Sequence, residues 1–219
     1  MLHELILTFH GLGEPPGSIG EAERDVWVPV EWLEAILDAP PGRGVGVAFD
    51  DGNASDVEHA LPMLAERGVA ARFFPVTGRI GAAGYLGVED IARLSAAGMR
   101  IGSHGLHHRD WRTLADDELH EELAVSRRAL AEIVGAEVTE AACPFGSYDR
   151  RVLRALRAAG YRRVFTSDGG AHASGAWPSS RTTVNGSRPL ADWLALARAD
   201  ASPTRDPARL AKRLVKRLR

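Results

Sequence analysis

Seven short apolar runs recur along the chain, and segments with helical periodicity separate most of them. The runs are short and rich in apolar or β-branched residues, which is typical of strands buried on both faces of a sheet. They lie at Leu5–Phe9, Val45–Phe49, Val69–Val76, Arg100–Ser103, Glu140–Cys143, Arg163–Ser167 and Thr182–Val184. Repeated strand–helix pairs predict an α/β fold with a parallel sheet, closed or nearly closed into a barrel.

Four segments between these runs have the apolar spacing of helices. They begin near Ser55, Val88, Asp116 and Asp149, and the last three extend to Ala97, Val134 and Ala159. We expect Ser55 to cap the first helix, whose boundaries Pro62 leaves open. The segments 11–23 and 168–180 predict long loops. In such a fold, the loops that follow the strands surround the active site.

Charge is distributed unevenly along the 219-residue chain. Residues 207–219 hold six basic and no acidic residues, whereas residues 1–206 hold 29 acidic and 21 basic ones, a net charge of −8. We therefore expect a single domain over residues 1–200, followed by a linker and a basic amphipathic tail over residues 201–219. An acidic body argues against nucleic acid as the main partner.

Composition excludes further classes of protein. The single cysteine, Cys143, cannot form an internal disulfide or a cysteine zinc cluster, and its apolar surroundings predict a small buried residue. No apolar run approaches the roughly 18 residues that a membrane span needs. The first ten residues lack the basic and apolar regions of a signal peptide, so we expect a cytoplasmic location.

Carboxylates and imidazoles follow two of the expected strands. Asp50 and Asp51 close the second run and precede Gly52, whose backbone freedom permits a sharp turn. His104 and His108, four residues apart after the fourth run, can direct both imidazoles at one ion. Two imidazoles and a carboxylate predict a catalytic zinc site, with cobalt, manganese or nickel as substitutes. The alternatives are a helix-capping turn at the aspartates and hydrogen-bonded histidines without a metal.

Three motifs in this order resemble the polysaccharide deacetylases, carbohydrate esterase family 4. They are Phe49-Asp50-Asp51-Gly52, His104-x-x-x-His108 and Pro144-Phe145-Gly146-Ser147-Tyr148-Asp149. The opening Leu7–Gly11 and the run Ala71–Val76 are similar to segments of the same family, so the resemblance covers about residues 4–185. It implies a distorted, TIM-barrel-like (β/α) barrel with about seven parallel strands.

The resemblance also implies a division of labour among these residues. Asp50 would be the general base, and the metal ion would be held by Asp51, His104 and His108. Water polarised by the metal would attack the carbonyl of an N-acetyl group on a sugar. The backbone N–H in the turn at Phe145 would help to hold the oxyanion, and the products would be acetate and a free amine.

Two family motifs that supply catalytic groups are altered here. The arginine that often precedes the Pro-Phe-Gly turn is absent, and we expect Arg181 to supply the cation that orients Asp50. The late Leu-x-His motif is also absent. His10 is the candidate general acid, because it ends the first strand and a barrel brings that strand next to the last. The alternatives are a surface ion pair for Arg181 and an orienting or pocket-lining role for His10.

Four further residues are candidates for contact with the substrate. The Asp-x-x-Asp-Trp motif of some members has no match in the expected place, and Asp168 is the nearest acidic residue at a strand end. It could contact substrate or an arginine, or simply start a turn. Trp111, Tyr148 and Trp177 fall in or beside the loops of the site, where aromatic rings stack on sugars or contribute packing.

The sequence leaves several functions open. The leading interpretation is N-deacetylation of a sugar or glycan, and the expected location favours a small or lipid-linked substrate. The alternatives are an amidohydrolase of a small N-acyl amide and a non-catalytic carbohydrate-binding protein. The apolar residues of the tail share one helix face, and these are Leu210, Leu214, Val215 and Leu218. This pattern suits a peripheral helix at the inner membrane face, a helix docked on the acidic body or a solvated terminus.

Overall fold

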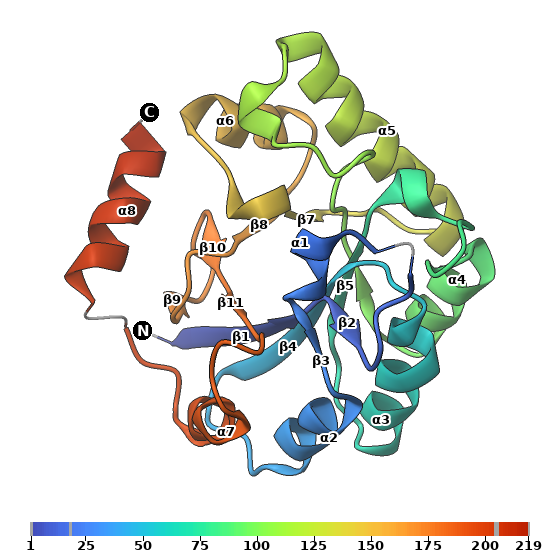
Figure 1. Ribbon diagram of the computed structural model, residues 1–219. Helices are drawn as coiled ribbons and strands as arrows, with labels where there is room; N and C mark the ends of the chain where they lie inside the picture. The colour runs from blue at the N-terminus through green and yellow to red at the C-terminus, as the bar shows by residue number, and fades with distance from the viewer. Residues whose placement is uncertain (1, 18, 204–205, 219) are drawn as a thin grey trace.

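A computed structural model describes residues 2–17, 19–203 and 206–218 and contains two main parallel sheets (Figure 1). The larger sheet has the strand order β11-β1-β4-β5-β6, and β9 pairs with the start of β1 in the antiparallel direction. The second sheet has the order β10-β8-β7. The strands are β1 (His3–Phe9), β4 (Val45–Asp51), β5 (Arg72–Pro75), β6 (Arg100–Ile101), β7 (Glu140–Ala142), β8 (Arg163–Thr166), β9 (His172–Ala173), β10 (Ser179–Ser180) and β11 (Thr182–Thr183).

The two sheets adjoin at both of their edges. On one side, Ser103 just after β6 forms a parallel bridge with Ala141 of β7. On the other side, Arg181 alone separates β10, which pairs with β8, from β11, which pairs with β1. Seven parallel strands therefore surround a common interior when β10 and β11 are taken as one interrupted strand. The expected α/β fold is confirmed, although no single sheet of the described residues closes on itself, because the last strand changes partner at Arg181.

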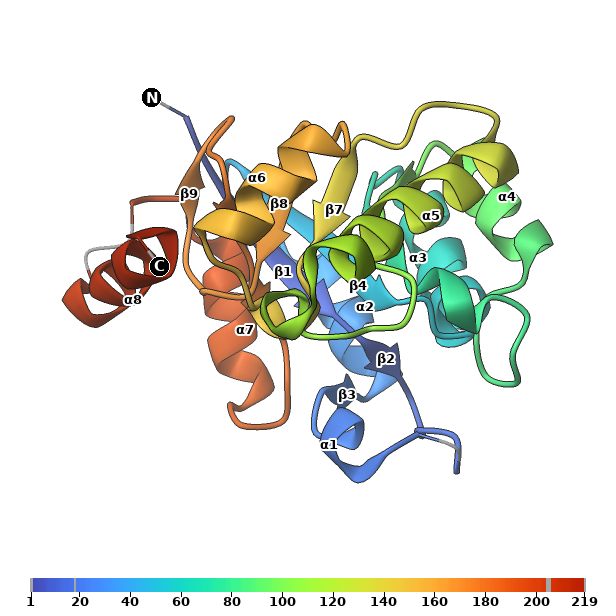
Figure 2. The same ribbon diagram turned by 90° about the horizontal axis from the view of Figure 1, so that it is seen from above.

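Apart from α1, the helices lie around the outside of the strands (Figure 1), and α5 and α6 contact each other beside β7 and β8 (Figure 2). The helices are α1 (Glu21–Arg24), α2 (Val30–Asp38), α3 (Leu61–Glu66), α4 (Val88–Ala96), α5 (Asp116–Val134), α6 (Arg150–Ala158), α7 (Leu190–Arg198) and α8 (Pro207–Leu218). The helices expected near Val88, Asp116 and Asp149 are confirmed as α4, α5 and α6. Within the described ranges, no helix is both long enough and apolar enough to cross a membrane.

Three local expectations are wrong. Ser55 does not cap a helix, because its hydroxyl instead accepts a hydrogen bond of 3.2 Å from the backbone N–H of Leu12. A π-helical turn, Asp56–Ala60, precedes α3. The segment expected to be a loop over residues 11–23 contains β2 (Gly11–Leu12) and α1, and β2 pairs with β3 (Trp27–Val28). The other expected loop, over residues 168–180, contains the short strands β9 and β10. Together β2, α1 and β3 project beyond one end of the strands (Figure 2).

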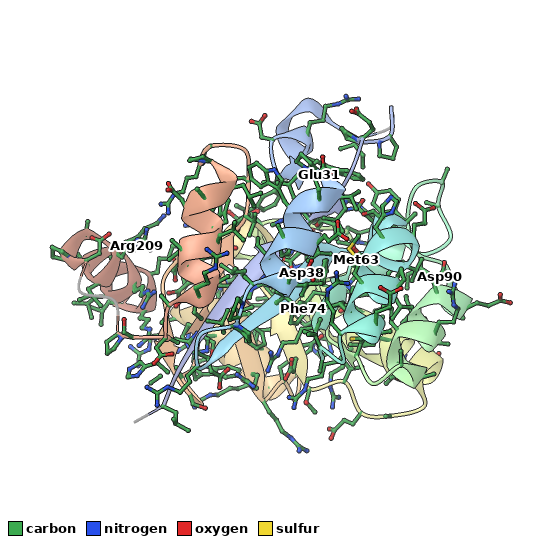
Figure 3. All side chains as sticks on the ribbon, turned by 90° about the horizontal axis from the view of Figure 1, so that it is seen from below. Glu31, Asp38, Met63, Phe74, Asp90 and Arg209 are labelled. Atoms are coloured by element: carbon green, nitrogen blue, oxygen red, sulfur yellow. The ribbon has the colours of Figure 1, made fainter. Side chains whose placement is uncertain are left out.

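Alternate residues of the strands face two different cores. One core is a buried cluster inside the ring of strands, made of Ile6, Ala48, Phe74, Ala142 and Phe165. Figure 3 shows Phe74 in the middle of the molecule. The neighbouring strand residues, such as Phe49 and Phe73, belong to the larger core between strands and helices. Because side chains alternate along a strand, Asp50 lies on the same face of β4 as Ala48 and points into the ring.

Candidate active site

Asp50 lies inside the ring near the end of β4, where Arg181 meets it. The Nη1 and Nη2 atoms of Arg181 donate hydrogen bonds of 2.7 Å each to the two carboxylate oxygens of Asp50. Arg181 is 0 % exposed, and its guanidinium lies over Phe74 and Phe165, 5.0 and 5.8 Å from the ring centres. Burial disfavours the Asp50 carboxylate, but the charge and hydrogen bonds of Arg181 help to outweigh burial and hold the pKa of Asp50 well below its usual range. Asp50 is therefore ionised at neutral pH.

Asp51, His104 and His108 form a compact cluster beside this ion pair. The Oδ1 atom of Asp51 lies 3.7 Å from Nε2 of His104 and 3.4 Å from Nε2 of His108. The same oxygen is buried and has no hydrogen-bond partner, which is a costly state for a carboxylate in a protein interior. One candidate ligand atom from each residue lies within 4.8 Å of the others. The donor set therefore fits a divalent metal ion such as zinc.

The backbone conformation and burial of these residues place their side chains in the state that metal binding requires. Asp51 and His108 have φ angles of 72° and 55°, left-handed conformations that are uncommon outside glycine and cluster at functional sites. The Nδ1 atom of His104 lies 2.9 Å from the carbonyl oxygen of Ala142 and donates to it in the tautomer that leaves Nε2 free. Burial lowers the pKa of both His104 and His108 to about 4, so both imidazoles are neutral, as metal ligands must be.

Two acidic residues outside the sequence motifs support the loop that carries the histidines. Glu122 of α5 is buried and accepts hydrogen bonds from the backbone N–H groups of Leu106 (2.8 Å) and His107 (3.1 Å). Glu23 of α1 places its Oε1 atom 3.7 Å from Nδ1 of His108. Acidic residues beside the second ring nitrogen orient metal-ligating histidines, and Glu23 has this place at His108, whereas Glu122 holds the backbone of the loop. No local pattern in the sequence marks Glu23, because its contact with His108 depends on where α1 lies relative to the loop that carries the histidines.

Asp56 is a further buried carboxyl near the cluster. Neither of its oxygens has a hydrogen-bond partner. Burial, with the charges of Asp51 and Asp50 added, raises the pKa of Asp56 well above its usual value. These effects favour the neutral form of Asp56, so it adds less negative charge to the site than its sequence position suggests.

A cavity of about 220 Å³ opens over the metal-type cluster, and its lining includes His10, Asp50 and Phe145. The Nε2 atom of His10 lies 3.9 Å from Oδ2 of Asp50, and its Nδ1 is buried without a partner. Phe145 has a φ angle of 57°, is 67 % exposed, and its ring centre lies 4.6 Å from that of His108. Cys143 also lines the cavity, but burial raises the pKa of its thiol to about 12, so it is not a nucleophile.

The four residues expected to contact substrate do not line this cavity. Trp111 is fully buried in the core. Tyr148 and Asp168 are buried as well, and the Tyr148 hydroxyl donates a hydrogen bond of 2.8 Å to the Asp168 carboxylate. Arg157 lies over the ring of Trp177, 4.9 Å from its centre. These side chains contribute packing in this structure, and their contact with substrate stays a prediction.

Fold and site together define a barrel-like α/β protein with a candidate divalent-metal centre at the carboxyl ends of its strands. The polysaccharide deacetylase family model matches residues 38–164, more than half of the chain, and the chain belongs to this family. The matched segment contains Asp50 and the three cluster residues. It includes neither His10 nor Arg181, the two residues expected to replace the groups that the altered family motifs supply.

Among curated proteins, YxkH of Bacillus subtilis is a relative, and its name gives polysaccharide deacetylase as an inferred assignment. It is 27 % identical over 132 residues, which are 60 % of this chain and 47 % of YxkH. The chain therefore spans about half the length of this curated relative.

Solved structures, deacetylases among them, share the fold. PplD of Streptococcus pyogenes, in complex with acetate, aligns with a TM-score of 0.78 and 18 % identity over 90 % of this chain and 98 % of PplD. IcaB from Ammonifex degensii gives 0.74 and 22 % over 90 % and 97 % of the two chains. BC0361, a polysaccharide deacetylase from Bacillus cereus, gives 0.77 and 19 % over 90 % and 69 %. At these identities the likeness concerns the fold.

Proposed function

We propose that the protein removes an N-acetyl group from a sugar or glycan with the help of a divalent metal ion, zinc foremost, held by Asp51, His104 and His108. The observation that carries the proposal is the Asp51 Oδ1 atom, a buried carboxylate oxygen without a hydrogen-bond partner between two neutral imidazoles. Family membership supports a carbohydrate substrate. The metal ion, when bound, supplies a more acidic water, with a pKa near 7 in favourable sites, and polarises an acyl oxygen.

Asp50 is the proposed general base. Its carboxylate lines the cavity beside the cluster, with Oδ2 3.9 Å from Nε2 of His104. Arg181 fixes both carboxylate oxygens and keeps them ionised, so Asp50 can accept a proton from an attacking water at neutral pH. Arg181 acts through Asp50 and is thus a positioning residue.

His10 and Phe145 are proposed to act on the two ends of the breaking amide. His10 lines the same cavity from the end of β1, and in its protonated form it would give a proton to the leaving amine. The backbone N–H of Phe145 would donate to the oxyanion that develops on the acyl oxygen. The left-handed backbone of Phe145 supports this role, because such strained turns cluster at active sites.

Lipid linkage of the substrate and contact of residues 207–219 with the inner membrane face stay predictions of the sequence. Three cations of α8 contact the body of the protein instead. Arg213 donates to Ser180, Lys216 to Asp168 and Arg217 to the carbonyl oxygen of Pro178.

Acetate release from N-acetylglucosamine oligosaccharides tests the proposed function. We expect the zinc-loaded protein to release acetate and a chelator to stop the release. Asp50→Asn should lower kcat by about 100-fold or more, because it removes the general base. His10→Ala should remove the alkaline limb of the pH–rate profile, and a wild-type profile would rule out its role as the acid.

The metal-binding part of the proposal has a matched pair of variants. His108→Ala should abolish zinc binding. His107→Ala should retain it, because His107 Nδ1 pairs with Glu122 outside the cluster. Zinc-loaded protein that releases no acetate from any of a panel of N-acetylated sugars would contradict the proposal. Release from small N-acyl amides alone would point to an amidohydrolase, and sugar binding without turnover would point to a carbohydrate-binding protein.

A further inference from the structure

The C-terminal helix α8 reaches the turn that carries Phe145 through one side chain. The Nζ atom of Lys216 donates a hydrogen bond of 2.8 Å to the carbonyl oxygen of Gly146. It donates a second one, of 2.7 Å, to Oδ1 of Asp168. Gly146 directly follows Phe145, whose N–H is the proposed oxyanion donor. A helix 70 residues further along the chain thereby contacts the active-site turn from behind.

The turn Pro144–Gly146 has a backbone that needs to be held. Phe145 and Gly146 have φ angles of 57° and 60°, two successive left-handed residues. That conformation costs a residue other than glycine about 1–2 kcal/mol. Within the turn, the Gly146 N–H donates to the carbonyl of Cys143 at 2.9 Å. A Cβ atom on Gly146 would lie 2.7 Å from the backbone nitrogen of Ser167, so the turn also packs directly against the end of β8.

Lys216 is itself held in a fixed position. The Asp168 carboxylate that it contacts also accepts hydrogen bonds from the hydroxyls of Tyr148 (2.8 Å) and Thr166 (3.0 Å). The ammonium group lies 5.0 Å from the centre of the Tyr148 ring. The side chains of Lys216 and Asp168 are 20 % and 2 % exposed, so their ion pair is better shielded from water than an ordinary surface pair. Lys216 therefore brings a charge-assisted hydrogen bond to the turn from a rigid support.

We infer that Lys216 is a positioning residue, which fixes the Phe145 turn and through it the N–H that binds the oxyanion. The inference rests on the proposed deacetylase function. It extends the functional unit into residues 207–219, which lie beyond the segment 38–164 that matches the family. Oxyanion donors stabilise the transition state only when they are held close to the productive geometry. A looser turn should therefore slow the chemical step without weakening metal binding.

The two lysines of the chain both lie on α8 and supply matched variants. Lys212 is exposed, so Lys212→Ala is the control for Lys216→Ala. We expect Lys216→Ala to lower kcat for acetate release from N-acetylglucosamine oligosaccharides about tenfold, with KM and zinc affinity unchanged. Lys216→Arg, which keeps a cationic donor, should recover part of kcat. The double variant Lys216→Ala with Asp168→Asn leaves no unpaired buried charge and should still show the lower kcat.

Hydrogen exchange of the backbone amides 145–148 gives a readout that needs no substrate. Lys216→Ala should speed exchange in this turn and leave the 104–108 loop unchanged, whereas Lys212→Ala should change neither. Unchanged exchange with a wild-type kcat in Lys216→Ala overturns the inference. A lower kcat that is accompanied by weaker zinc binding and a lower thermal midpoint also overturns it, because the effect is then a general loss of folded structure. If the wild-type protein releases no acetate, the proposed function fails and so does the part of Lys216 in positioning an oxyanion donor, whereas hydrogen exchange still decides whether Lys216 holds the turn.

Discussion

At the scale of single residues, one ion pair determines whether Asp50 can serve as a base. A carboxylate that is 1 % exposed would carry a raised pKa without a cation beside it. The family often places that cation before the Pro-Phe-Gly turn, whereas here Arg181 reaches Asp50 from the break between β10 and β11. The interior rings of Phe74 and Phe165 hold the guanidinium in place. The cation thus comes from another part of the chain, and its two N–H groups still donate two parallel hydrogen bonds to the carboxylate.

Replacing Arg181 should impair both stability and the acid side of the pH–rate profile. Arg181→Met leaves a buried carboxylate without its partner, which typically costs about 3–5 kcal/mol of unfolding free energy. The pKa of Asp50, now well below its usual range, should rise. Since Asp50 must be ionised to accept a proton, activity should begin to fall at a higher pH than in the wild type. Thermal unfolding and kcat measured against pH follow the two effects.

Arg163→Met is the matched control for Arg181→Met. Arg163 also lies over the Phe165 ring, but it pairs with Glu4 at the opposite end of the strands. Its replacement should leave the pH–rate profile unchanged. If Arg181→Met kept wild-type turnover while Asp50→Asn abolished it, Arg181 would have no part in orienting the base.

At the scale of elements, the strands were more predictable than the contacts between elements. β1, β4 and β8 differ from their predicted ranges by two residues or fewer at each end, because an apolar run buried on both faces has no competing pattern. The clustering of the strand-end residues followed from the shared direction of parallel strands. The partner of Ser55 could not be predicted, because Leu12 comes from a distant segment. One sign in the sequence pointed to Glu122: it is a charged residue on the buried face of α5, directly before Leu123.

Glu122 should control metal affinity through the loop between the two histidines. Glu122→Gln replaces an acceptor of two backbone N–H groups by an amide that presents only one acceptor oxygen. The loop that carries His104 and His108 should then be less well ordered. Zinc affinity should therefore fall, by less than the about 10–100-fold that the loss of a direct hydrogen-bond partner of a metal ligand typically costs, because Glu122 holds the loop backbone and not a ligand ring. Competition for zinc with a chromophoric chelator measures the change.

The control for Glu122→Gln is Glu121→Gln, an exposed position one residue earlier on the same helix. It removes the same charge and should leave zinc affinity unchanged. Equal affinities in the two variants would show that the loop is ordered without help from α5.

At the scale of the whole molecule, the basic tail forms α8 at one edge, where Arg209 is labelled (Figure 3). Arg213 and Lys216 turn toward the body, whereas Leu214 and Leu218 are 58 % and 71 % exposed. The sequence indicated both a cationic and an apolar face but could not decide which one meets the body. That choice depends on Asp168, a buried acceptor whose position relative to the tail is set by the fold.

Metal binding should stabilise the whole molecule, and the histidine pKa values set the pH range of the effect. Zinc at about 100 times its Kd adds about 2.7 kcal/mol, which raises the thermal midpoint of a chain of this size by about 5–10 °C. Histidine in an unfolded chain has a pKa near 6.5, whereas burial lowers the pKa of His104 and His108 to about 4. Between these values the unfolded chain binds protons that the folded protein does not. These two histidines therefore cost the metal-free protein stability as the pH falls from about 6.5 toward 4.

The stabilisation by zinc should persist to about pH 5, because the two imidazoles of the folded protein are still unprotonated there. Thermal unfolding followed by circular dichroism, with zinc or with chelator at several pH values, measures the difference directly. His108→Ala should abolish the difference, and His107→Ala should keep it. A difference that disappears already near the pKa of an exposed histidine would mean that the cluster is open to water. Equal midpoints with zinc and with chelator at neutral pH would mean that Asp51 and the two histidines do not hold a metal ion.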